Sequence, residues 1–349
     1  MKKYQLSSIL FFFTFLSLIS FIAFSCSNSS EPAYVPEPGR RDYIWTMDTI
    51  KIPFTILQSI WGSSPNDIWA VGPGGDLDKT IFHFDGFKWK SDGIVRNLSP
   101  LGIWGTTSKN IWICAMEGKI WHFNGFSWAQ DTVISLSNFI SLSFQDIWGD
   151  EESNLYAVGH AQDIHNKFIG VLFHYNGKVW NKISVQEEFC SFLKIKKCDG
   201  CLKYFIFGVT QNQASSDTFK IFEYSNNKMK NIYSGTGSKN EFPYFEKIGN
   251  NILFVIGMNV YKYNNNKFEK YFELHPNTNH ALSGRNMKDV FLSLKSGIAH
   301  FNGSNIENLY EFSNSDVRII DELILEKDVF FLAYDFSKSI HIIIKGHLN

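Results

Sequence analysis

The amino-acid sequence predicts an all-β protein, a seven-bladed β-propeller made of four-stranded antiparallel blades. Two repeated patterns, described below, carry this prediction, and the composition agrees with it. Aromatic side chains make up 16% of the 349 residues and charged side chains only 19%, which excludes a disordered chain or a charged coiled coil. The net charge of −1 offers no field for a polyanion, so we expect no nucleic-acid partner.

Residues 1–25 are predicted to be an export signal. Lys2 and Lys3 precede an apolar stretch, residues 9–24, that ends just before Cys26 and a run of small polar residues. The stretch is short for a membrane-spanning helix. It resembles a bacterial lipoprotein signal, in which the cysteine is acylated and begins the mature chain. This resemblance implies a lipid anchor on Cys26; plain secretion and an uncleaved anchor are the alternatives.

Residues 26–42 are then the lipidated cysteine and a flexible tether. Ser, Asn, Glu and Pro dominate this segment, and such a composition favours an extended, solvated chain. We therefore expect an exported protein held on the bacterial cell envelope, at the outer membrane, by lipid. A secreted or periplasmic protein is the alternative.

From residue 43 onward the chain is an internal repeat. The first signature, Ile-Trp-Gly followed by a short apolar strand, occurs at residues 60–62, 103–105 and 147–149. The second signature is a histidine, an aromatic residue, an Asp-Gly or Asn-Gly turn and a tryptophan, and it occurs at residues 83–89, 122–128 and 174–180. Such dipeptides form tight hairpins. The period of about 44 residues is that of a four-stranded propeller blade.

Fainter copies complete the count of blades. The third-strand signature continues at residues 222–226, 260–265, 298–303 and 339–345. The last unit has only three strands, at residues 317–321, 328–333 and 339–345. Residues 43–48 supply the fourth, because Trp45 matches the outer-strand Trp89 and Trp128. We expect this N-terminal strand to pair with the C-terminal ones and close the ring, which removes the open sheet edges.

The repeat pattern of residues 43–349 resembles the β-propeller lipoproteins of bacterial envelopes and, more loosely, kelch-like propellers. The resemblance implies a fold and a location. It implies no reaction, because propellers serve as enzymes, binders and scaffolds alike.

Two recurring residue types have a structural explanation. His83, His122, His174 and His300 share one repeat position, which favours a hydrogen-bonding or packing role over catalysis. The tryptophans Trp61, Trp104 and Trp148 also recur. We interpret them as packing between blades, rather than as sugar-stacking platforms.

The cysteines suggest a local disulfide. Cys198 and Cys201 flank an Asp-Gly turn between two predicted strands, which favours a bond across the hairpin. Cys190 is a competing partner or, with the other two, part of a zinc site that lacks an evident fourth ligand. Cys114 is predicted to be a buried thiol. A disulfide-exchange role for Cys198 and Cys201 requires an accessible thiol with a low pKa.

The longest loops offer a candidate binding face. They connect second to third strands, or one blade to the next, and so open on one face of the ring. His160, Asp163 and His165 are weak candidates for a metal site, with a solvated polar loop as the preferred reading. Candidate contact residues on this face are Asp76, Asp78, His160, Asp163, His165 and Asp217.

The sequence contains no recognisable catalytic motif. We predict a non-catalytic binding or scaffolding module without a cofactor, whose partner is a protein or a glycan of the envelope. The alternative is a glycan-active hydrolase or lyase that uses the same face. A central pocket with two or three converging carboxylates favours the enzyme, whereas a flat or apolar face favours the binder.

Overall fold

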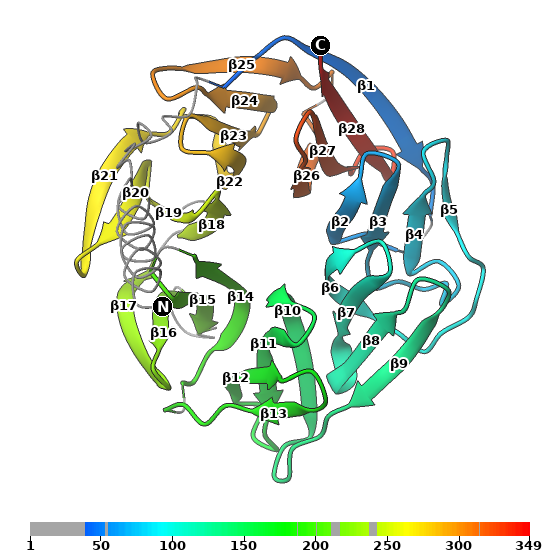
Figure 1. Cartoon of the computed structure of the whole chain (residues 1–349), viewed down its shortest axis with the longest axis vertical. Coiled ribbons are helices and arrows are strands. Elements are labelled where there is room, and N and C mark those ends of the chain that lie inside the picture. The colour runs from blue at the N-terminus through cyan, green and yellow to red at the C-terminus, as the bar shows by residue number, and fades with distance from the viewer. Residues whose placement is uncertain are drawn as a thin grey trace, which may run out of the picture. The chain divides into compact units, whose positions relative to one another are not determined.

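The computed structural model describes residues 39–349, apart from residues 53–54, 187, 200, 211–216, 237–242 and 314. The predicted signal peptide, Cys26 and most of the tether therefore lie outside the described residues. The propeller unit consists of seven four-stranded antiparallel sheets arranged in a ring, as the sequence predicts (Figure 1). Its one helical element among the described residues is a 3-10 turn, η1 (Met116–Gly118), and no helix there is long and apolar enough to cross a membrane.

The first three blades contain the strongest repeats. Blade one contains β2 (Ser59–Ser64), β3 (Asp67–Val71), β4 (Ile81–Phe84) and β5 (Trp89–Ser91). Blade two contains β6 (Pro100–Thr107), β7 (Asn110–Ala115), β8 (Lys119–Phe123) and β9 (Trp128–Val133). Blade three contains β10 (Ser141–Glu151), β11 (Asn154–Gln162), β12 (Phe168–Tyr175) and β13 (Trp180–Lys182).

The remaining blades follow the same order from the axis outward. Blade four contains β14 (Ser191–Cys198), β15 (Lys203–Thr210), β16 (Thr218–Ser225) and β17 (Lys228–Thr236). Blade five contains β18 (Tyr244–Ile248), β19 (Asn251–Ile256), β20 (Asn259–Asn264) and β21 (Lys267–Glu273). Blade six contains β22 (Thr278–Asn286), β23 (Asp289–Leu294), β24 (Gly297–Phe301) and β25 (Ile306–Glu311). Blade seven contains β26 (Val317–Ile324), β27 (Asp328–Asp335), β28 (Ile340–Leu348) and β1 (Tyr43–Ile50).

The two ends of the propeller unit meet in blade seven. β1 is its outer strand and pairs antiparallel with β28, from Tyr43 opposite Leu348 to Ile50 opposite His341. Trp45 faces Gly346 across this pair. The predicted closure is therefore confirmed, with a strand slightly longer than the sequence pattern indicates.

Residues just before β1 also fasten blade seven to blade six. The Gly39 N–H donates to a blade-six backbone carbonyl at 2.8 Å. The Arg41 guanidinium donates to the carbonyl oxygen of His300 at 2.9 Å, and the Tyr43 hydroxyl accepts from Arg285 at 3.0 Å. The closing strand is thus held by side chains as well as by its ladder.

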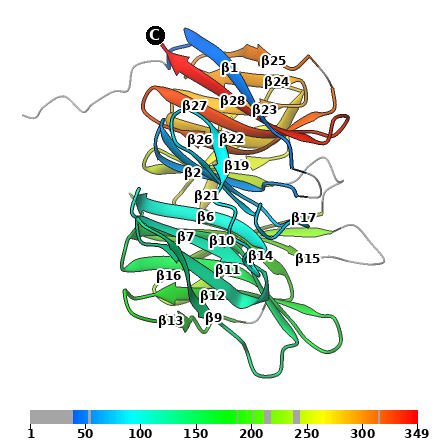
Figure 2. The ribbon, with the colours of Figure 1, turned by 90° about the vertical axis from the view of Figure 1, so that its right-hand side faces the viewer.

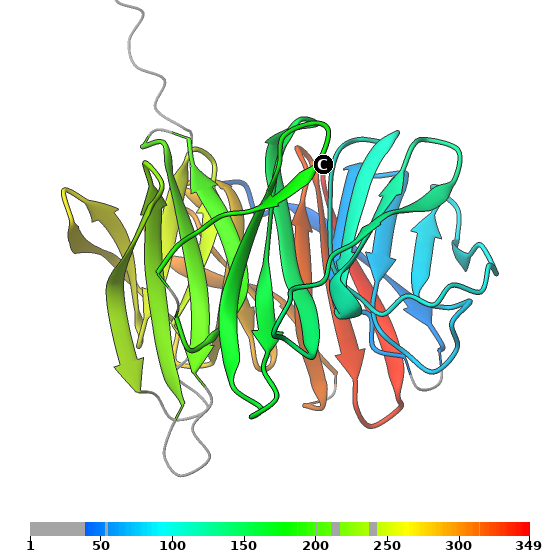
Figure 3. The same cartoon turned by 90° about the horizontal axis from the view of Figure 1, so that it is seen from below.

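The two faces of the ring differ. The turns that join first to second and third to fourth strands form one face, here called the turn face. The connections between second and third strands and between blades form the opposite loop face. Figure 3 shows the C-terminus at the turn face and the β27–β28 connection at the loop face, and Figure 2 gives a second side view.

The core lies between neighbouring sheets, where the repeated tryptophans fit over glycines. A Cβ atom on Gly105 would lie 2.8 Å from Trp61 Cζ2, and one on Gly149 would lie 3.1 Å from Trp104 Cη2. Trp148 continues the series by contacting an aromatic ring of blade four. Each indole thus rests on the next blade, and Trp61 and Trp104 do so at positions that only glycine leaves open. This confirms the packing interpretation of the tryptophans.

Removing β1 should open the ring. A chain that begins at Gly39 keeps β1, whereas one that begins at Lys51 leaves the β28 edge unpaired and exposes the apolar side chains beneath it. We expect the shorter chain to melt at least roughly 10 °C lower or to aggregate, since each lost kcal/mol lowers Tm by a few degrees. Calorimetry and size-exclusion chromatography of both chains check this. Equal melting temperatures would show that closure is dispensable.

Candidate functional site

The recurring histidines tie second and third strands together. In four blades the imidazole Nε2 is hydrogen-bonded, at 2.6–2.8 Å, to the Asp or Asn that begins the second strand. The pairs are His83 with Asp67, His122 with Asn110, His174 with Asn154 and His300 with Asp289. The ring also stacks on an aromatic side chain, as Trp69 does on His83 with 4.1 Å between centroids. The predicted structural role is confirmed.

Blades four and seven keep this link with other residues. In blade four, Lys203 takes the place of the acid and Glu223 that of the histidine, and their charged atoms lie 2.8 Å apart. In blade seven, Asp328 pairs instead with Lys345 at 3.1 Å. The contact between second and third strands therefore does not require a histidine, because other pairs of complementary side chains also form it.

The candidate metal-binding residues of blade three do not form a ligand set. His160 lies within β11, paired with Ser143 and Gly170, and not in a loop as predicted. The strand extends to Gln162, two residues beyond His160. Its ring packs against Phe168, and burial lowers the pKa of this histidine. Asp163 accepts the backbone N–H groups of its own loop, including that of His165 at 2.8 Å. Among the described residues no three His, Cys, Asp or Glu side chains gather as metal ligands.

The other candidate loop residues are spread over separate blades. Asp76 pairs with Lys79 at 2.9 Å in blade one, and the carbonyl of the neighbouring Asp78 accepts a hydrogen bond from Ser91. Asp217 directly precedes β16 in blade four. These side chains therefore mark the loop face without converging on one site.

The cysteine pair at the β14–β15 turn is reduced in the structure. Cys198 and Cys201 are free thiols, and Cys201 Sγ lies 3.8 Å from the carbonyl oxygen of Cys198. Burial and the neighbouring Cys198 raise the pKa of Cys201 to about 12. A thiol with that pKa is almost entirely protonated at neutral pH, which argues against a disulfide-exchange role. A disulfide in the oxidised protein stays a prediction. Cys114 is buried in β7, as expected.

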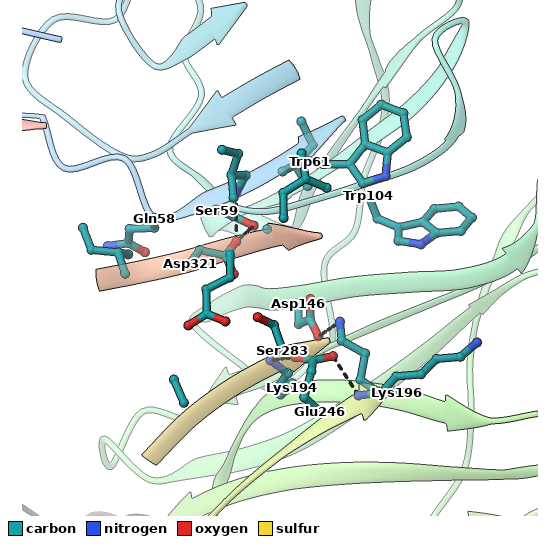
Figure 4. Close-up of a pocket in the computed structure, with 18 of the residues that line it drawn as sticks. Gln58, Ser59, Trp61, Trp104, Asp146, Lys194, Lys196, Glu246, Ser283 and Asp321 are labelled. Carbon is teal, nitrogen blue, oxygen red and sulfur yellow. Dashed lines mark hydrogen bonds and ion pairs between the residues drawn. The ribbon is translucent and has the colours of Figure 1, made fainter. Parts of the chain in front are cut away.

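A polar cavity lies in the central channel. A cavity of about 380 Å³ is lined there by the inner strands of all seven blades (Figure 4). Trp61 and Trp104 line it from blades one and two. Blades four to seven contribute charged and hydroxyl side chains instead, among them Lys194, Glu246 and Ser283. The channel therefore has an aromatic side and a polar side, at a size that suits part of a flexible ligand.

Most charges in the channel are paired. Lys194 Nζ lies 2.5 Å from Glu246 Oε2 and donates to the Tyr244 hydroxyl. Burial alone would lower the pKa of Lys194, but Glu246 and Asp146 raise it above its usual value. Burial likewise opposes the charge on Glu246, and Lys194 holds the pKa of that carboxyl below its usual value. Lys194 and Glu246 are therefore a charged pair at neutral pH.

Two acidic side chains join neighbouring blades. Asp321 accepts the Ile60 N–H at 2.8 Å and the Ser59 hydroxyl at 3.0 Å. Asp146 accepts the Ile195 N–H at 2.9 Å in the same manner. Both carboxylates are used as links between the inner strands.

Glu322 is the exception among the channel carboxyls. It stands at a strand position that is occupied by a buried apolar residue in every other blade: Ile60, Ile103, Ile147, Ile195, Phe245 and Leu282. Its Oε1 accepts the Ser293 hydroxyl, whereas Oε2 is buried without a hydrogen-bond partner. Ser283 Oγ, also in the cavity wall, is buried, and it lies close enough to the Glu322 carboxyl to favour the charged form of that group. Burial raises the pKa of Glu322 to about 7, and the nearby Asp321 and Glu246 add to the shift.

Glu322 Oε2 and Ser283 Oγ are thus buried polar atoms in the channel wall, and a ligand reaches them only if neighbouring side chains move. Buried polar atoms without partners are uncommon in folded proteins and cost free energy until something satisfies them. An incoming donor or acceptor at Glu322 and Ser283 would gain those hydrogen bonds. The site is therefore suited to binding a polar group between aromatic and charged walls.

These channel residues were missed by sequence reasoning, although a signal was present. The inner strand reads Ile-Trp-Gly in blades one to three, but lysines follow Ile195, and Glu322 takes the place of the isoleucine itself. A charged residue at a repeat position that is apolar in the other blades is the signal that would have indicated the channel wall.

Comparison with known proteins supports the fold alone. No protein-family model and no curated protein matches the chain. A structure described as YCF48 bound to D1 peptide has a TM-score of 0.57 at 12% identity, and the match covers 90% of this chain and 100% of that one. YCF48 from Cyanidioschyzon merolae gives 0.56 at 12%, over 86% and 98%. The WD40 β-propeller domain of Doa1 gives 0.56 at 8%, over 86% and 96%. This chain shares the propeller architecture with all three.

The buried Glu322 should make stability depend on pH. Its pKa is about 7 in the folded protein and near 4.5 in the unfolded chain. Between pH 4.5 and pH 7, Glu322 is mostly ionised in the unfolded chain but mostly protonated in the folded protein. The unfolded chain therefore binds fewer protons in this interval. The free energy of unfolding should fall by roughly 3 kcal/mol as the pH rises across this interval.

Urea unfolding between pH 5 and pH 8 measures this effect, with those two values bracketing most of the interval set by a pKa of about 7. E322Q cannot ionise and should lack most of the fall. E311Q removes an exposed glutamate of blade six and should retain it. Parallel pH profiles for the wild type and E322Q would contradict the assignment.

Proposed function

We propose that this propeller is a non-catalytic binding module for a polypeptide partner in the cell envelope, with the channel as its primary site. The observation that carries the proposal is the channel wall, where half-buried Trp61 and Trp104 line one side and charged and hydroxyl side chains, Glu322 and Ser283 among them, line the other. A peptide has the matching chemistry, because its amides satisfy polar atoms and its apolar side chains pack on indole rings.

The loop face supports the same proposal. Val95, Ile164 and Phe189 are large apolar side chains exposed on this face. The propeller of YCF48, which is similar in fold, has been solved with a bound peptide. That similarity supports a peptide ligand here without identifying it.

A glycan-active hydrolase or lyase is the second candidate. Glu322 favours it, since a carboxyl with a pKa near 7 is suited to act as a general acid. Glycosidases ordinarily need a second carboxylate, however, and here Asp321 links two blades while Glu246 is paired with Lys194. A single carboxyl fits binding better than a two-carboxylate reaction.

We also propose that the protein is exported and anchored through Cys26. The basic, apolar and small-residue order of the N-terminus supports this, together with a domain whose ring closes without residues 1–38. The anchor would leave the propeller in an aqueous compartment, attached to a membrane by its tether.

A displayed library of random peptides tests the binding proposal. Residues 39–349 contain all seven complete sheets, so this fragment is the bait. We expect selected peptides to lose affinity about ten-fold or more for the E322Q/S283A double variant, the effect of one or two lost hydrogen bonds. E311Q should bind as the wild type does.

Two outcomes would overturn the proposal: a library that yields no binder, or binders that are insensitive to the channel variants. A glycan array and an assay for released reducing ends run on the same proteins. Glycan cleavage that disappears in E322Q would establish the enzyme instead.

Lipidation is tested by labelling cells with a clickable palmitate analogue. The wild-type protein should carry the label and sediment with membranes. C26S should lose the label and appear in the soluble fraction, while C198S serves as the matched cysteine control and should keep it. An equal label on C26S would contradict the anchor.

A further inference from the structure

The turn face carries an arc of protruding apolar side chains. Phe87 and Phe126 are 94% and 90% exposed, more than any other large apolar side chain among the described residues. They stand at equivalent positions in the third-to-fourth-strand turns of blades one and two. Exposed Val179 extends the arc over blade three, and exposed Leu202 lies in the first-to-second-strand turn of blade four, nearer the axis. Nothing in the fold requires a phenylalanine at the tip of a tight turn.

The two turns hold these rings outward. Asp85 and Asn124 each accept two backbone N–H groups from the residues that follow, at 3.0–3.1 Å. Gly86 and Gly125 adopt φ values of +89° and +92°, which a tight hairpin of this kind requires. Since the backbone is fixed, the rings cannot fold back into the core, and each presents almost its whole surface to the solvent.

Basic side chains accompany the arc. The third-to-fourth-strand turns of blades one, three, four and five carry exposed lysines, namely Lys88, Lys178, Lys228 and Lys267. The acidic residues Glu151, Glu152, Asp199 and Glu326 of this face belong to the first-to-second-strand turns, which lie nearer the axis, and Asp85 in the rim turn of blade one is paired with Lys90 at 2.9 Å. The outer rim of the turn face is therefore apolar and basic. This combination binds anionic lipid surfaces, where each nearby lysine contributes about 1 kcal/mol.

The chain enters the propeller on this same face. Gly39 is hydrogen-bonded to Lys288 in the β22–β23 turn, and the C-terminal Asn349 lies beside Asp42. Residues 27–38 span at most roughly 40 Å when fully extended. A tether of that length keeps its membrane within reach of the turn face.

We propose that the turn face of blades one to four lies on the anionic membrane to which the chain is anchored. Phe87 and Phe126 insert at the level of the headgroups, and the rim lysines contact lipid phosphates. The proposal rests on anchoring at Cys26. It directs the loop face away from the membrane, which leaves that face accessible to a partner.

Hydrogen exchange of the mature chain tests this orientation. In a C198S/C201S background, which removes the free thiols of the turn face, Cys26 is coupled to a maleimide lipid in vesicles of phosphatidylethanolamine and phosphatidylglycerol, and exchange is compared with that of the uncoupled protein. We expect amides of residues 85–89 and 124–128 to exchange about five-fold or more slowly on vesicles, while residues 93–97 of the loop face do not change. F87S/F126S should abolish the protection.

The control V95S/F189S removes exposed apolar groups from the loop face and should keep the protection. Unchanged exchange in both turns, protection of the loop face instead, or equal loss in the two double variants would overturn the proposal. If a soluble partner or a second copy of this chain covers the turn face instead, exchange in both turns will be the same with and without vesicles. Because the coupling supplies the anchor chemically, a negative result would count against the membrane orientation alone. It would not bear on natural lipidation or on peptide binding.

Discussion

The structure depends on the requirement that every sheet be flanked by two others. Each blade is apolar on both faces, so an open array would leave two broad apolar surfaces in water. Pairing of β1 with β28 satisfies the requirement by making blade seven from both ends of the unit. The contacts of Arg41 and Tyr43 with blade six strengthen that junction. The central channel exists only because the ring is complete.

The channel is asymmetric because the repeats have diverged. Blades one to three keep the indole and glycine contacts that join neighbouring inner strands. Blades four to seven use charge instead, as the Lys194 and Glu246 pair shows. Asp321 in blade seven and Asp146 in blade three show that part of the channel's charge forms hydrogen bonds between blades. Glu322 has no such structural use for one of its oxygens, and it is therefore the residue that most strongly indicates a ligand.

Sequence reasoning succeeded where the repeat was strong and local. The count of blades, the closure through residues 43–48 and the roles of Trp61 and His83 all follow from periodic positions, because identical positions must make identical contacts. Placement of His160 in a loop was wrong, since the length of a β-ladder depends on the partner strand and not on local composition. The channel residues could not be found by motif, because Lys194, Glu246 and Glu322 come from three blades and only the closed ring brings them together.

The order of the chain has a consequence for how the molecule acquires its shape. The Asn349 side chain donates to the carbonyl of Asp42, and 307 positions of sequence separate these partners. β1 therefore stays unpaired until β28 has been synthesised. Contacts so remote in sequence form slowly, because a long loop must be closed before they contribute any energy. The ring is completed only after β28 is available to pair with β1, and until then the unpaired sheet edges must be kept from aggregating.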